Sequence, residues 1–207
     1  MSRAWNRSRE NALVSDGLKP GETQVLLGGD LRIVLTFCRD RYAHSIQCKL
    51  NGAWLELLAS IEGDHRDDWP ASPPLQQLHI EQRDERHLAF LIGMAGKSHW
   101  SLSIELDPNA RRVECDVACR LRTPAERLAS TYHIAHPADG VRPQEALWTL
   151  DGVRCRLEAA SDRAPTCISP AGEDKVEITP MAVLGEYPQT VRWKYALSLS
   201  APGASSG

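Results

Sequence analysis

The sequence lacks the features of a membrane-spanning or exported chain. None of its 207 residues falls in a window that approaches the roughly 18 consecutive apolar residues of a membrane helix. The opening segment MSRAWNRSRENALVSDG has neither an apolar run nor the small-residue cleavage site of a signal peptide. We therefore expect a cytoplasmic protein with no membrane partner.

An excess of basic residues is also missing. The chain has 24 Lys and Arg against 27 Asp and Glu, which gives a net charge of −3, and basic and acidic residues are interleaved along its length. Nucleic-acid-binding proteins usually concentrate positive charge on one face. We therefore expect no nucleic-acid partner.

The cysteines lack the spacing of a metal or redox site. No CxxC pair and no His/Cys zinc pattern occurs. Cys115 and Cys119 share a strand face, but four residues of strand place them about 13 Å apart, too far for a disulfide or a shared metal. We expect buried free thiols and no cofactor or metal, for Cys38, Cys48, Cys115, Cys119, Cys155 and Cys167.

Common catalytic motifs are absent as well. The chain has no P-loop, no strand–GxGxxG–helix unit, no GxSxG elbow and no HExxH. These absences argue against nucleotide, nicotinamide and serine-hydrolase chemistry. Enzymes whose sites are assembled from scattered residues remain open.

The sequence does contain many segments of alternating apolar and polar residues. A hairpin around Arg39-Asp40 places Leu35 opposite His44 and Ile33 opposite Ile46. Asp151-Gly152 predicts a second tight hairpin, because both turn positions need positive φ. A final strand over residues 191–199 carries its apolar residues on one face. A convincing 3.6-residue period is missing, although Thr123–Ser130 predicts one or two helical turns and the N-terminal arm could contain a short helix around Arg9–Val14.

Four further segments predict a meander of adjacent strands. They are Leu75–Gln82, His87–Met94, Lys97–Leu106 and Arg111–Leu121. We expect His79 opposite Phe90, Phe90 opposite Ser101, Ser101 opposite Asp116, Ile92 opposite His99, and Ile104 opposite Val113.

These patterns predict an all-β fold, an antiparallel sandwich built from hairpins and a meander. We expect a flexible arm over residues 1–20, one sandwich domain over residues 21–200 and a disordered tail over residues 201–207.

One face of the meander is polar and contains two imidazoles. Phe90 and Ile92 would form an apolar floor, surrounded by His79, His99, Ser101, Glu105, Asp116 and Arg112. Such a face could bind a polyhydroxylated ligand or carry out acid/base chemistry. It is also what an ordinary solvated sheet face looks like.

The longest segment without strand pattern is Glu62–Pro74. Its donors Asp64, His65, Asp67 and Asp68 match no calcium loop, so we expect no metal there. Trp69 precedes Pro70 and could stack on a sugar or a partner. Alternatively, it folds back over the end of the sandwich.

A long meander with histidines and carboxylates on one sheet face resembles the supersandwich of galactose-mutarotase-like proteins. The resemblance covers the strand pattern of residues 22–200 and includes no matched catalytic motif. It implies sugar acid/base chemistry on the concave face of the larger sheet. The chain is shorter than members of that family usually are.

Three functional hypotheses remain. The first is a non-catalytic module that binds a carbohydrate-like ligand or a protein partner through Trp69 and the face with His79 and His99. The second is a small acid/base enzyme acting on a sugar, with one of these histidines and Glu105 or Asp116. The third is a structural or assembly subunit. We favour the first, and oligomeric state stays open.

Overall fold

Segments of alternating apolar and polar side chains form strands along most of the chain that the structure describes. The computed structural model describes residues 13–14, 19–64, 66–135, 138–160, 164–181 and 185–200. These residues form strands, turns and irregular segments, with no helix among them. The predicted all-β class is therefore confirmed. No segment in these ranges is a helix long and apolar enough to span a membrane.

The strands form two antiparallel sheets. The nine-stranded sheet contains, in spatial order, β1 (Leu13–Val14), β6 (Gln77–Arg83), β7 (Arg86–Ala95), β8 (Ser98–Asp107), β9 (Arg112–Leu121), β16 (Gln189–Ser200), β13 (Val153–Ala159), β12 (Glu145–Leu150) and β11 (Gly140–Arg142). The seven-stranded sheet contains β14 (Thr166–Pro170), β15 (Lys175–Pro180), β10 (Ser130–Ile134), β5 (Ala53–Ser60), β4 (Arg41–Leu50), β3 (Leu31–Cys38) and β2 (Thr23–Gly28).

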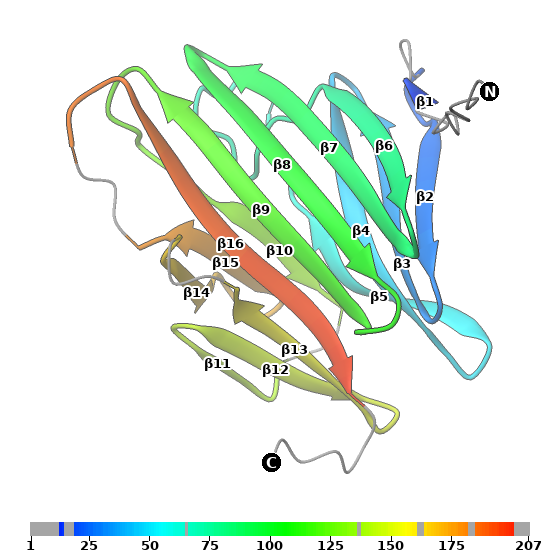
Figure 1. The fold of residues 1–207 in the computed structure, drawn as a ribbon. Helices are drawn as coiled ribbons and strands as arrows, with labels where there is room; N and C mark the ends of the chain where they lie inside the picture. The colour runs from blue at the N-terminus through cyan, green and yellow to red at the C-terminus, as the bar shows by residue number, and fades with distance from the viewer. Residues whose placement is uncertain are drawn as a thin grey trace, which may run out of the picture.

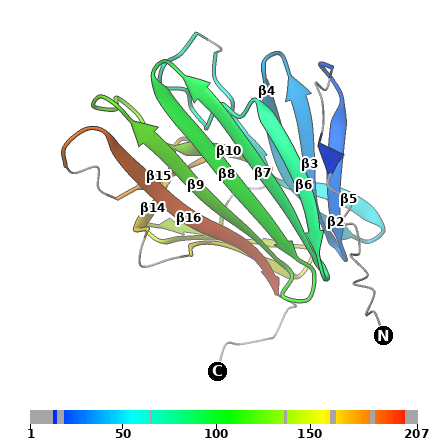
Figure 2. The same ribbon diagram turned by 45° about the horizontal axis from the view of Figure 1, so that its top comes forward.

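The two sheets pack face to face, as Figures 1 and 2 show from two directions. The C-terminal strand β16 lies between β9 and β13 and joins the meander to the β11–β13 segment. Side chains from the inner faces form one continuous core, which includes Trp100 and Trp193 from one sheet and Ile33 and Ile46 from the other. The predicted sandwich is confirmed.

Several predicted pairings are confirmed residue by residue. Leu35 lies opposite His44 and Ile33 opposite Ile46. In the second hairpin, Asp151 and Gly152 have φ of 44° and 79°. These values match the turn geometry that the Asp-Gly sequence predicts. The apolar residues of β16 lie on the buried face, also as predicted.

Two registers in the meander differ from prediction by two residues. Phe90 lies opposite Ser103, and Ile92 lies opposite Ser101. Ser101 lies opposite Ala118, while Ile104 lies opposite Cys115. The expected pairs Phe90–Ser101, Ile92–His99, Ser101–Asp116 and Ile104–Val113 were therefore wrong.

The cause is the position of each turn. Between β8 and β9 the strands extend to the pair Asp107–Arg112, and the Asp107 carboxylate accepts N–H bonds from Asn109 and Ala110 at 3.0 Å. Between β7 and β8 the turn includes Gly96 at φ 53°. Moving a turn by one residue shifts the pairing by two, and a shift of two keeps every side chain on its predicted face.

The expected helical turns at Thr123–Ser130 were also wrong. Residues 122–129 are irregular, and Ser130 begins β10. Leu128 and Ala129 are buried, so core packing determines the path of this connector. Most of the predicted arm at 1–20 and the whole predicted tail at 201–207 lie outside the described residues.

Candidate functional site

A hollow on the outer face of the nine-stranded sheet is the candidate site. It forms because small side chains lie side by side at its centre: Ser101 on β8 is directly opposite Ala118 on β9. Larger side chains flank this pair, with Ile92 opposite Ser101 on β7 and Arg192 opposite Ala118 on β16. A row of large, small, small and large residues leaves a depression on a sheet face.

This depression continues along the strands as a groove. Its upper part has a volume of about 410 Å³ and its lower part about 410 Å³, and both parts include Ile92, Ser101 and Ala118. The volume of the upper part alone is within the range of about 300–1,000 Å³ that is typical of small-ligand sites. We call this region the outer groove; its outward-facing side chains include Gln77, Phe90, Ile92, Met94, His99, Ser101, Ser103, Ala118, Arg120 and Thr190.

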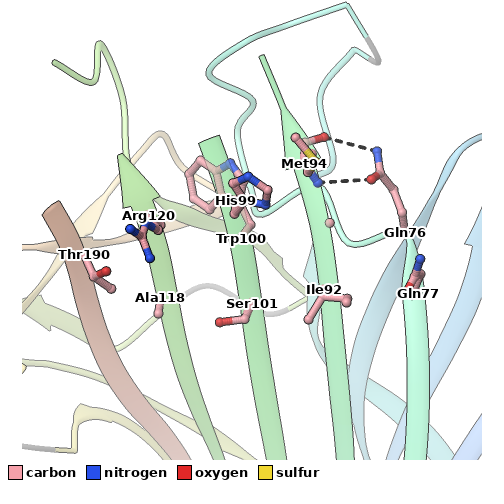
Figure 3. A pocket seen from close by; sticks show the side chains of 11 residues that line it. Gln76, Gln77, Ile92, Met94, His99, Trp100, Ser101, Ala118, Arg120 and Thr190 are labelled. Atoms are coloured by element: carbon pink, nitrogen blue, oxygen red, sulfur yellow. Dashed lines mark hydrogen bonds between the residues drawn. The ribbon is translucent and has the colours of Figure 1, made fainter. Parts of the chain in front are cut away.

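The upper end of the outer groove combines apolar and hydrogen-bonding side chains (Figure 3). His99 lies opposite Met94 on one side and Arg120 on the other, and Arg120 lies opposite Thr190. Ile92 and Met94 are 51% and 44% exposed. Neither the His99 nor the Arg120 side chain has a hydrogen-bond or ion-pair partner among the described residues.

Gln76 closes one side of this end. Its side-chain amide donates to the Met94 carbonyl at 3.1 Å and accepts from the Met94 N–H at 3.0 Å, as Figure 3 shows. These two hydrogen bonds resemble the backbone pairing between neighbouring strands, and they hold Met94, which forms this wall of the groove, in place. The wall is therefore set before a ligand arrives.

Two predicted site residues, Glu105 and Asp116, belong to a lattice of ion pairs on the same sheet face. Arg86 contacts Glu105 at 2.5 Å, and Arg192 contacts Asp116 at 2.5 Å. Asp116 borders the lower part of the groove, whereas Glu105 lies nearer the β8–β9 turn and does not line it. Each carboxylate already has a cationic partner, so neither is poised as a free acid or base.

The predicted pair of histidines is not brought together. His79 lies on β6 opposite Phe90, stacks on that ring, and contacts Glu81 at 3.1 Å. His99 lies on β8, two strands away from His79, and it is four residues from Ser103, which is in line with His79 and Phe90. Strand geometry therefore places the two histidines roughly 16 Å apart. Arg112, named with them, contacts Glu158 at 2.6 Å outside the groove.

Trp69 does not line the outer groove. It is half-buried and packs against the hydrophobic core, which is the alternative in which the indole folds back over the sandwich. Of the predicted ligand residues, His99 and Ser101 therefore lie in the groove's upper part and Asp116 at its lower border. The ligand role of all six remains a prediction.

The prediction missed Arg120, Thr190, Met94 and Gln77. The strand alternation already placed Arg120 and Met94 on the outer face. The incorrect registers, however, did not place them opposite His99, as the structure does. Thr190 could not be placed, because β16 pairs with β9 across about 70 residues of chain. Outward Ser and Ala positions on adjacent strands were the available signal.

The interior contains a separate polar chain. His44 Nε2 lies 2.7 Å from the Tyr132 hydroxyl, which lies 2.5 Å from the Tyr195 hydroxyl. Trp193 donates its indole N–H to Ser130 at 3.0 Å. Burial lowers the pKa of His44 to about 4 and raises the pKa values of both tyrosines. These groups are enclosed between the sheets and position one another.

Glu62 lies at the edge of this polar region. Its carboxylate accepts a short hydrogen bond from Ser60, whose hydroxyl also accepts the His44 backbone N–H at 2.8 Å. Burial raises the pKa of Glu62 to about 7, although Ser60 and Arg41 oppose the shift.

A second hollow of about 700 Å³ lies near the β11–β13 hairpins and β14. Within it, Arg156 contacts Glu145 and Glu158 at 2.8 Å each.

Metal-ligating side chains do not cluster in the described part of the chain: no group of three or more His, Cys, Asp or Glu there could hold an ion. The expectation of no metal at Asp64, His65, Asp67 and Asp68 stays a prediction, because His65 lies outside the described residues.

Comparison with known proteins adds no identity to this geometry. No protein-family model matches the chain, and no curated protein matches its sequence. The resemblance to galactose-mutarotase-like proteins therefore stays a prediction from the strand pattern.

Proposed function

We propose that this protein is a non-catalytic binding module whose outer groove takes a carbohydrate-like ligand. The observation that carries the proposal is the composition of the groove's upper end. Ile92, Met94 and Ala118 offer apolar surface, while His99, Ser101 and Arg120 offer hydrogen-bonding groups without partners of their own in the described structure. A sugar ring presents the same combination, with C–H faces and hydroxyl edges.

The acid/base alternative is less well supported. The upper groove has one imidazole, His99, and no carboxylate among its lining residues. General acid/base chemistry on a sugar needs two groups in opposite protonation states near the substrate. A mutarotase-like activity therefore has no pair of residues to carry it at this end of the groove.

A cytoplasmic location is part of the proposal. All six cysteines lie in the described part of the chain, and all six are free. Free thiols in this number fit a reducing compartment.

Assembly with a protein partner is the second candidate function. β2 is the edge of the seven-stranded sheet, and it exposes Val25 and Leu27 at 50% and 54%. Unpaired edge strands with exposed apolar side chains favour association. Oligomeric state in solution tests this candidate.

A thermal-shift screen against mono- and oligosaccharides tests the binding proposal. Ser101→Trp fills the groove centre from an outward position and leaves the core untouched, while Thr149→Trp places the same side chain on the same sheet outside the groove. We expect a saccharide that raises Tm in the wild type and in Thr149→Trp but not in Ser101→Trp. A hundredfold excess over Kd would stabilise the fold by about 2.7 kcal/mol.

Either of two results contradicts the proposal. One is the absence of a shift with every saccharide. The other is a shift that Ser101→Trp retains, because the ligand would then bind elsewhere.

A further inference from the structure

We infer that the ligand of the outer groove carries a carboxylate at one end, as a uronic acid does. This inference rests on the proposed function, since it names the class of carbohydrate that the groove takes. It starts from the charges at the upper end of the groove.

Arg120 is an uncompensated cation in the groove. The other arginine of the groove, Arg192, contacts Asp116 at 2.5 Å. Elsewhere on this sheet face Lys194 contacts Glu114 at 2.5 Å and Arg86 contacts Glu105 at 2.5 Å. Arg120 has no such partner in the described residues, although it belongs to the same sheet.

The lining of the upper groove contains no acidic side chain, whereas the chain as a whole has a net charge of −3. The nearest groove carboxylate, Asp116, is two residue rows from Arg120 along β9 and is held by Arg192. An anion entering this end therefore meets one guanidinium and no repelling carboxylate from the lining.

Three residues with hydrogen-bond donors lie side by side across three neighbouring strands. The Arg120 guanidinium lies between His99 on β8 and Thr190 on β16, and these two residues are its direct cross-strand neighbours. Figure 3 shows all three side chains at the same end of the groove. A guanidinium fork with flanking N–H and O–H donors matches the two oxygens of a carboxylate.

The rest of the groove determines what the carboxylate is attached to. Ile92, Met94 and Ala118 form an apolar surface next to the donors, and Ser101 adds a hydroxyl at the centre. A bare inorganic anion or acetate would leave this surface in water. A pyranose ring with a carboxylate at C6 covers the apolar surface and reaches the donors together.

An NMR titration that follows the groove amides of the full chain measures the preference directly. We compare galacturonate with galactose and glucuronate with glucose, and include acetate as the anion without a ring. The acidic sugar should bind about fivefold more tightly than its neutral counterpart, the upper range for an exposed ion pair. Acetate should bind more weakly than either uronate, and 0.5 M salt should reduce the preference because it screens the charge.

Arg120→Gln tests the assignment, with Arg154→Gln as the matched control. Arg154 is an exposed arginine on the same sheet, outside the groove. We expect Arg120→Gln to remove the preference for the acidic sugar over its neutral counterpart, and Arg154→Gln to keep that preference.

The possible results separate the inference from the proposed function. Equal binding of acidic and neutral sugars, or a preference that survives in Arg120→Gln, overturns the inference and leaves the groove as a sugar site. Acetate binding as tightly as the uronates overturns the sugar part. If no sugar binds, both the inference and the proposed function fail.

Discussion

Individual polar side chains in this protein fall into two groups with opposite consequences. In the interior, His44, Tyr132 and Tyr195 form a hydrogen-bonded chain at 2.5–2.7 Å, and burial keeps all three neutral. On the outer face, His99 and Arg120 have no partners among the residues described. The interior groups serve stability, while the outer ones are available to a ligand.

Residue-level burial leads to a prediction about pH. The pKa of Glu62 is about 7 in the fold against 4.5 when exposed, so the folded state binds the extra proton and stability falls as pH rises from about 4.5 to 7. The pKa of His44 is about 4 in the fold against 6.5, so the unfolded state binds the extra proton and stability rises from about pH 4 to 6.5. The two trends oppose each other over most of this range.

Glu62→Gln should separate the two trends. Without the carboxylate, the free energy of unfolding should rise with pH between 4.5 and 6.5, at up to about 1.4 kcal/mol per pH unit. The wild type should be nearly flat there and should lose stability between pH 6.5 and 7.5. Urea denaturation at pH 5, 6.5 and 8 measures both profiles. Identical profiles would mean that Glu62 titrates normally in the fold.

At the scale of strands and turns, local pairing decided what could be predicted. Strand faces were predicted correctly because the side-chain period is two, and a register error of two preserves it. The outward positions of His99 and Ser101 therefore held although their partners were wrong. Thr190 and the wall made by Gln76 depend on non-local contacts, which no alternation pattern encodes.

The segment before β6 gives a prediction about elements. Leu75 accepts a hydrogen bond from Tyr42 of the seven-stranded sheet at 2.7 Å, and Gln76 donates to Ile92 of the nine-stranded sheet at 2.8 Å. This bridge passes so close to Gly93 that a Cβ there would lie 1.8 Å from the Pro74 carbonyl oxygen. A glycine is therefore needed for the backbone to approach β7.

Gly93→Ala should displace the bridge and destabilise the fold by about 2–3 kcal/mol, a large effect for one methyl group. Gly140→Ala is the control, since a Cβ at Gly140 meets nothing within 4 Å and should cost nothing. Chemical denaturation of the two variants gives the comparison. If Gly93→Ala is as stable as Gly140→Ala, the close approach is not required.

At the scale of the whole molecule, the two sheets share one core, and both sheets contribute buried cysteines to it. Cys48 lies in the seven-stranded sheet, and Cys115, Cys119 and Cys155 lie in the nine-stranded sheet; all four are buried. Burial raises the pKa values of Cys115, Cys119 and Cys155 to about 12. By contrast, Cys38 is exposed and Cys167 is partly exposed.

This distribution predicts the course of thiol labelling under native conditions. Cys38 should react first with a thiol reagent and Cys167 more slowly, because only exposed thiolate reacts. If residues 21–200 form one cooperative domain, the four buried thiols should react together, at a rate set by global unfolding. Mass spectrometry of quenched samples resolves each site, and Cys38→Ser should remove only the fast phase. Labelling of Cys155 well ahead of Cys48 would mean that the β11–β13 region opens by itself, and the single-domain prediction would then be wrong.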